Sequence, residues 1–197
     1  MSPLIIISSL LALFSAFLNI RAILLGKAKP HRTTFFIFVL INSLAFASLF
    51  AQHDTVAIYL AFFNAASLLI IFLLSLKYGM GGWAPLDIVC LLIALVGITI
   101  WKFTSIPMIA LYSAIFADIV SLIPTFKKIY FHPKTEVWEF WFIGFLSALL
   151  NLLAVKSWDF NSILFPLFLT IANLVTVLLI IRKHLFSLIP LYQRGKP

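Results

Sequence analysis

The sequence predicts an all-α integral membrane protein with seven transmembrane helices. Apolar residues make up 63% of the 197 positions, charged residues only 10%, and the mean hydropathy is +1.15. A soluble domain of this size could not bury so much apolar surface. The apolar residues form seven runs, each approaching the roughly 20 residues that cross a hydrocarbon core about 30 Å thick. These runs cover residues 3–25, 33–51, 55–76, 86–102, 105–126, 136–155 and 163–181.

Local signals at the ends of the runs support these boundaries in order. The first run has no basic segment before it and exceeds the apolar core of a signal peptide, so we expect it to be retained as the first helix. Pro30 separates the first run from the second, and the glycine-rich stretch 78–85 separates the third from the fourth. Pro133 precedes the sixth run, where Thr135 or Glu136 would suit the free amides of a new helix N-terminus. Thr33 would do the same for the second run.

The basic residues predict the orientation of the chain. Twelve of the 14 lysines and arginines fall in or beside alternate connections and the C-terminal segment, and only Lys102 and Lys156 face the other side. By the positive-inside rule the N-terminus lies outside and the C-terminus in the cytoplasm. We expect a bacterial plasma membrane. The twelve are Arg21, Lys27, Lys29, Arg32, Lys77, Lys127, Lys128, Lys134, Arg182, Lys183, Arg194 and Lys196.

The composition argues against several other classes of function. The net charge of +8 is spread over short juxtamembrane connections, where topology and anionic headgroups account for it, so we expect no nucleic-acid partner. The single cysteine, Cys90, excludes an internal disulfide or a cysteine zinc cluster. The four histidines have no metal-ligand spacing, and no nucleophile–base–acid set or phosphate loop is present. We therefore expect neither an enzyme nor a bound cofactor or metal.

An internal repeat divides the chain. Residues 26–33 and 130–136 are both basic turns centred on a proline, with a threonine near the start of the next run. Aligning Pro30 with Pro133 gives three helices, one connecting helix and three helices. An odd number of helices per unit reverses the next unit unless one extra span intervenes, so the fourth run makes the two repeats parallel. The units are residues 1–76 and 105–185, joined by a linker helix at 77–104 and followed by a cytoplasmic tail at 186–197.

Two asparagines lie at matching depths of the repeat. Asn64 is nine positions into the third run and Asn173 ten into the seventh, which puts each roughly 14 Å deep at 1.5 Å per residue. A buried amide of this kind either bonds a neighbouring helix or binds a ligand. The matching positions favour a pair of substrate-binding amides.

Asp118 is the acidic residue that lies well inside a run. A carboxylate at that depth should face a cavity or a partner, which makes Asp118 a candidate for proton coupling. The alternative is a structural hydrogen bond to a neighbouring helix. Its counterpart in the first repeat is Ser15, so any proton coupling would be asymmetric.

Three further residues are candidates for roles in transport. Pro124 and Pro166 interrupt the fifth and seventh runs and could act as hinges, although such kinks are common in membrane helices. Trp158 opens the outer side of the second repeat and could stack on a sugar or base. An interfacial aromatic belt also explains its position.

The segments 123–130 and 132–136 resemble the SWEET and PQ-loop superfamily of small seven-helix transporters, which has the same three-one-three layout. In SWEET sugar transporters an asparagine of each third repeat helix lines the substrate site, and this resemblance maps that role onto Asn64 and Asn173. It also maps a hinge proline onto Pro124. The first repeat departs from the pattern, because Arg21 stands where the matching proline would be and neither copy contains a Pro-Gln pair.

The resemblance implies a transporter that moves a small, polar, sugar-like solute across the bilayer by alternating access. Relatives of the same layout include PnuC-type importers of nicotinamide riboside and exporters of amino acids, so a vitamin or amino-acid substrate stays open. A receptor or assembly protein that binds a peptide in the central cavity is the alternative from another class. A homo-oligomer is also left open.

Overall fold

A computed structural model describes residues 3–187 except 52–56, 83, 105–106, 156–157 and 159. These residues form helices and turns without a strand, which confirms the all-α prediction. The elements are α1 (Pro3–Leu24), α2 (Arg32–Ala51), α3 (Ala57–Tyr78), α4 (Pro85–Thr104), α5 (Pro107–Phe131), the 3-10 turn η1 (Pro133–Thr135), α6 (Trp138–Leu153) and α7 (Phe160–Ser187). Each predicted run thus contains one α-helix. The predicted tail lies, from residue 188 on, outside the described residues.

The start of α6 differs from the prediction. Neither Thr135 nor Glu136 caps this helix, because its N-cap is Val137, which has no side-chain capping bond. Glu136 is instead extended backbone (φ −125°, ψ 151°), and its carboxylate bonds Lys128 and Trp141. The expectation for Thr33 is also wrong, since α2 begins one residue earlier and the Thr33 hydroxyl has no partner in the described part of the chain.

The C-terminal end of α5 also differs. The helix continues to Phe131, past the predicted end at residue 126, so Lys127 and Lys128 lie on its last turns rather than in a loop. Burial explains the extension, because Ile129 is fully buried and Lys128 is 6% exposed.

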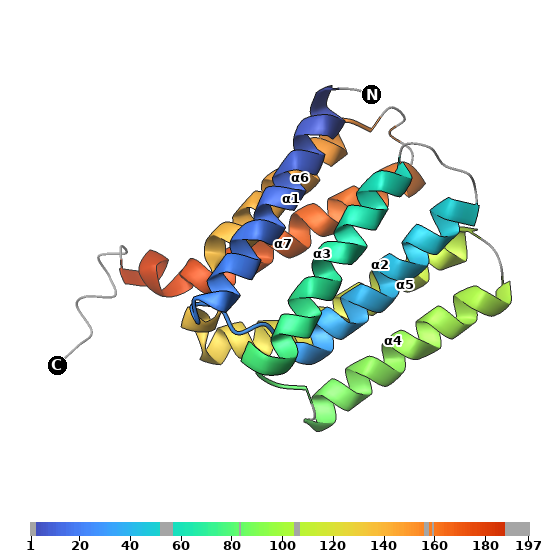
Figure 1. Cartoon of the computed structure of the whole chain (residues 1–197). Helices are drawn as coiled ribbons and strands as arrows, with labels where there is room; N and C mark the ends of the chain where they lie inside the picture. The colour runs from blue at the N-terminus through green and yellow to red at the C-terminus, as the bar shows by residue number, and fades with distance from the viewer. Residues whose placement is uncertain are drawn as a thin grey trace.

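The helices pack in a pattern that is unchanged when α1, α2 and α3 are exchanged with α5, α6 and α7. Helix α3 packs against both α1 and α2, and α7 packs against both α5 and α6. The two sets meet through α1 with α6 and through α2 with α5. Helix α4 packs mainly on α5 and lies at the edge of the bundle (Figure 1).

Three connections meet at one end of the bundle, below the helices in Figure 1. The amide of Lys29 donates to Thr135 O at 2.8 Å, and the amide of Met80 donates to Pro30 O at 3.1 Å. We call this the basic end, because the last turns of α1, α3 and α5 carry Arg21, Lys77 and Lys128 there. The structure therefore groups the connections that the basic residues assign to one side.

Arg32, at the start of α2, ties the connection between α3 and α4 to the basic end by hydrogen bonds. Its guanidinium donates to Ser75 O, Gly79 O and Gly81 O, at 3.1, 2.9 and 3.0 Å, and so satisfies carbonyl groups in and just after the last turn of α3. Gly81 has a φ of +76°, and a Cβ there would lie 2.1 Å from the imidazole of His31. Only glycine allows this close approach.

The surface is apolar and the interior contains many polar groups. Large apolar side chains are exposed on α1 and on α3 through α7, among them Leu10 at 62% and Phe17 at 58%. Buried hydroxyl and amide side chains include Ser8, Asn19 and Thr34. Two helical stretches, Pro3–Leu24 and Ile163–Arg182, are long and apolar enough to cross a membrane, judged over the described residues.

Candidate functional site: a polar cavity between two helix sets

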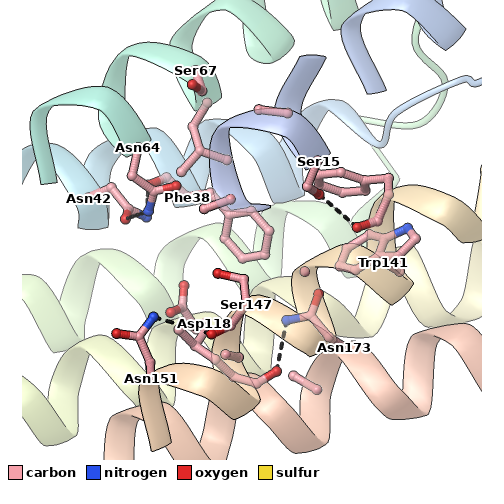
Figure 2. A pocket seen from close by; sticks show the side chains of 18 of the residues that line it. Ser15, Phe38, Asn42, Asn64, Ser67, Asp118, Trp141, Ser147, Asn151 and Asn173 are labelled. Carbon is pink, nitrogen blue, oxygen red and sulfur yellow. Dashed lines mark hydrogen bonds between the residues drawn. The ribbon is translucent and has the colours of Figure 1, made fainter. Parts of the chain in front are cut away.

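A cavity of about 370 Å³ lies at the centre of the bundle. Its lining comes from α1, α2 and α3 on one side and from α5, α6 and α7 on the other, with no contribution from the described residues of α4. Figure 2 shows Asn42 and Asn64 on one wall, with Asp118, Ser147, Asn151 and Asn173 on the other. The remaining lining is mostly apolar and aromatic, a combination typical of small-molecule sites.

The structure brings several of the predicted site residues together. Asn64, Asn173, Asp118 and Pro166 all line this cavity. Pro124 lies inside α5 and is buried but does not line it. Trp158 is 66% exposed near the start of α7 and is not part of the lining.

Asn64 is held by a second asparagine that the sequence analysis missed. The Nδ2 of Asn42 donates to Phe38 O, four residues earlier in α2, at 2.9 Å, which leaves the Asn42 Oδ1 free to accept. The Nδ2 of Asn64 donates to that oxygen at 2.7 Å. Asn42 lies nine residues into its predicted run, as Asn64 does, so the same depth argument would have identified it.

Asn173 is positioned by α7 and by a glycine of α6. Its Nδ2 donates to Leu169 O at 2.8 Å, one turn earlier. A Cβ at Gly144 would lie 2.7 Å from the Asn173 Oδ1, closer than such atoms approach one another. The absence of a side chain at Gly144 therefore leaves the room that the amide oxygen occupies at the cavity wall.

Asp118 and its predicted counterpart Ser15 line the same cavity from opposite sides. Asp118 is 5% exposed, and its Oδ1 has no hydrogen-bond partner among the described residues. Ser15 is instead engaged, because its hydroxyl donates to Phe140 O at 2.7 Å. The structure thus leaves the carboxylate unsatisfied and the serine satisfied.

A polar cluster joins α1 to α6 beside the cavity. The hydroxyl of Ser147 donates to Ser8 O at 2.9 Å, and the hydroxyl of Ser8 donates to Ser147 O at 3.1 Å. Asn151 donates to the Ser8 hydroxyl. Small polar residues of this kind allow close helix approach in membrane proteins.

A chain of polar contacts links the cavity to the basic end. Trp141 lines the cavity, and its indole Nε1 donates to Glu136 Oε2 at 3.1 Å. The other carboxylate oxygen pairs with the Lys128 ammonium, which also donates to Lys29 O at 2.6 Å. We call Lys128, Glu136 and Trp141 the Lys–Glu–Trp chain. The sequence analysis missed it, because Lys128 resembled one more basic residue of a loop.

A second polar contact between the two helix sets, which we call the seam, lies beside Pro124. The hydroxyl of Thr34 donates to Ser121 O at 2.6 Å, and the hydroxyl of Thr125 donates to Thr34 Oγ1 at 2.9 Å. All three side chains are fully buried. A proline at position 124 cannot donate to a carbonyl one turn earlier, so this seam joins α2 to the part of α5 where helical bonding is weakest.

No group of three or more metal-ligating side chains lies within the described residues. Comparisons with protein-family models, curated proteins and solved structures found no match. The resemblance to the SWEET and PQ-loop superfamily therefore stays a prediction.

Proposed function

We propose that this chain is a seven-span membrane transporter that moves a small polar organic solute by alternating access. The observation that carries the proposal is the central cavity, which has polar groups at mid-depth and lies between two helix sets. A solute bound there would contact both sets at once. A shift of one set against the other could then open the site to either side in turn.

The apolar exterior supports a bilayer as the surroundings. Exposed apolar side chains such as Leu92 and Val96 on α4 would be unfavourable in water and favourable in lipid. Polar groups lie instead at helix contacts and in the cavity. Seven spans with an external N-terminus would put the basic end in the cytoplasm.

The packing pattern supports two parallel three-helix repeats. Exchanging the two helix sets reproduces the contacts, and α4 stands outside this exchange. The register that aligns Pro30 with Pro133 also pairs residues that line the cavity: Ser15 with Asp118, Phe38 with Trp141, and, after about six inserted residues, Asn64 with Asn173.

Opening toward the cytoplasm would require breaking few bonds. At the basic end the two helix sets are joined by Lys29 with Thr135, by Lys128 with Lys29, and by the seam at Thr34. Pro124 and Pro166 are the proposed bending points, since each weakens the helix around it. Facilitated diffusion needs no further group, whereas proton coupling would use Asp118.

Uptake of labelled sugars, nucleosides, vitamins and amino acids into proteoliposomes tests the proposal. We expect Asn64→Ala and Asn173→Ala each to remove solute uptake while leaving expression and thermal stability nearly intact. Loss of one interhelical bond averages about 0.6 kcal/mol, whereas a solute group left unpaired costs about 1 to 3 kcal/mol. Thr176→Val, on α7 but outside the lining, is the matched control.

Binding of a solute or peptide without uptake would favour a receptor or assembly protein instead. Unaltered uptake in both asparagine variants would reduce the pair to a structural contact.

The orientation is tested separately by cysteine labelling in a Cys90→Ala background. Cysteines introduced at Lys29 and at Gln52, which lies outside the described residues, should show opposite accessibility. Equal labelling of both from outside would refute the proposed topology.

A further inference from the structure

The cavity contains one ionisable side chain, Asp118, among the described residues that line it. No lysine, arginine or histidine is part of that lining. Asp118 is 5% exposed, and among the described residues no donor bonds its Oδ1 and neither ion pair includes it. A buried carboxylate in this situation is costly unless a cation or a proton joins it.

Two asparagines of the cavity also offer amide oxygens as acceptors, beside the second N–H that each Nδ2 keeps. Hydrogen bonds fix the orientation of both amides. The Nδ2 of Asn173 donates to Leu169 O. The Nδ2 of Asn64 donates to Oδ1 of Asn42, whose own Nδ2 donates to Phe38 O. No protein donor is bonded to Oδ1 of Asn64 or Asn173 within the described residues. These oxygens and the Asp118 carboxylate are therefore available to a solute that donates hydrogen bonds.

Aromatic side chains line the same space. Trp141 is one of them, and its indole N–H bonds Glu136. Phe38 lines the opposite wall. Aromatic faces attract cations, and the attraction is strongest where water is excluded.

From these three observations we propose that the cavity binds an organic monocation whose positive group carries N–H donors, an ammonium or guanidinium, with Asp118 as its counter-ion. This inference rests on the proposed function, because it names the class of solute for that same site. It replaces a neutral, sugar-like solute by a donor-rich cation. Asn64 and Asn173 would accept further hydrogen bonds from the solute.

Three probes that differ only in their terminal group provide the test. Tyramine ends in an ammonium, tyrosol in a hydroxyl and 4-hydroxyphenylacetate in a carboxylate. Binding to the purified full chain in detergent micelles is measured by calorimetry. We expect tyramine to bind at least about tenfold more tightly than tyrosol, the ratio that one charge-assisted bond supplies, and the carboxylate not to bind.

Asp118→Asn should bring tyramine to the affinity of tyrosol and leave tyrosol unchanged. Thr176→Val, on α7 but outside the lining, should preserve the tyramine preference. The ranking of the three probes on the unmodified protein stands without either variant, should Asp118→Asn fail to fold.

Tyramine binding no tighter than tyrosol, including no binding of either, would overturn the inference, as would an Asp118→Asn protein that keeps the preference. Proteoliposome uptake separates this result from the transport proposal. Cation-selective binding without uptake would leave the cation site standing and remove the transporter. Uptake of a labelled neutral solute that is unchanged in Asp118→Asn would support the transporter and overturn the cation site.

Discussion

The two helix sets share an arrangement but differ in where they hold charge. In the register of Pro30 and Pro133, four positions of the first set are neutral where the second set is ionisable or carries an indole N–H: Leu25 and Lys128, Thr33 and Glu136, Phe38 and Trp141, Ser15 and Asp118. In the first set, Arg32 donates instead to carbonyl groups of α3 and of the connection after it, and the His31 imidazole lies 3.4 Å from Asp87 of α4. At these paired positions the charged groups thus belong to the second set.

The largest expected effect concerns the ion pair of the second set. Lys128→Met leaves the Glu136 carboxylate buried without its cation, and we expect the free energy of unfolding in detergent micelles to fall by about 3 to 5 kcal/mol. Lys128→Met combined with Glu136→Gln should recover most of this loss. Leu25→Met, at the matching exposed position of the first set, should change stability by less than about 0.5 kcal/mol. A Lys128→Met protein as stable as the unmodified one would erase the contrast between the sets.

A histidine of the first set should make the free energy of unfolding depend on pH. Burial lowers the pKa of His31 from 6.5 to about 4, although Asp87, 3.4 Å from its Nε2, opposes the shift, and Lys128 and Arg32 favour it. The folded chain then binds fewer protons than the unfolded chain between these values. Stability is fully present above pH 6.5 and should fall as the pH drops toward 4, by roughly 3 kcal/mol from this group.

The pH effect is isolated by comparing the unmodified protein with His31→Gln, because carboxylates common to both titrate in the same range. Glutamine cannot take up a proton, so its stability curve should be flatter between pH 6.5 and 4. Parallel curves would show that His31 contributes nothing to the pH dependence.

An intermediate effect is expected for the indole that links the cavity to the ion pair. Trp141→Phe makes the second set resemble the first, where Phe38 stands, and removes a hydrogen bond to a buried carboxylate. We expect a loss of about 1.5 to 3 kcal/mol in the free energy of unfolding. In a double-mutant cycle with Glu136→Gln, the two substitutions together should cost less than the sum of their separate losses. Strictly additive effects would mean that the bond contributes nothing measurable.

The smallest effect separates two neighbouring threonines of the first set. Thr34→Val removes two buried hydrogen bonds across the seam with α5, and we expect a loss of about 0.6 to 1.7 kcal/mol. Thr33→Val is the matched control, because the Thr33 hydroxyl is buried without a partner in the described part of the chain. That substitution should be neutral or stabilising. Equal losses at both positions would contradict the assigned seam.

The helices and the depth of their polar residues could be predicted because both depend on chain length. An apolar run long enough to cross a bilayer forms one helix, and Asn64, Asn173 and Asp118 reach one cavity because each lies near the middle of its run. Contacts between distant segments could not be predicted in this way. The burial of Lys128 depends on α5 extending to Phe131 and on the turn that returns Glu136 to it, neither of which hydropathy encodes.

Two charged side chains of the described residues find partners within their own half of the chain, which bears on how the chain could enter a membrane during synthesis. Lys128 meets Glu136 eight residues later, within one helical hairpin, and Arg32 finds its carbonyl partners before residue 82. Each of these two hairpins can therefore satisfy its own charged side chain without the other half of the chain. Insertion by hairpins would then not require Lys128 or Arg32 to wait in lipid for a partner from the other half.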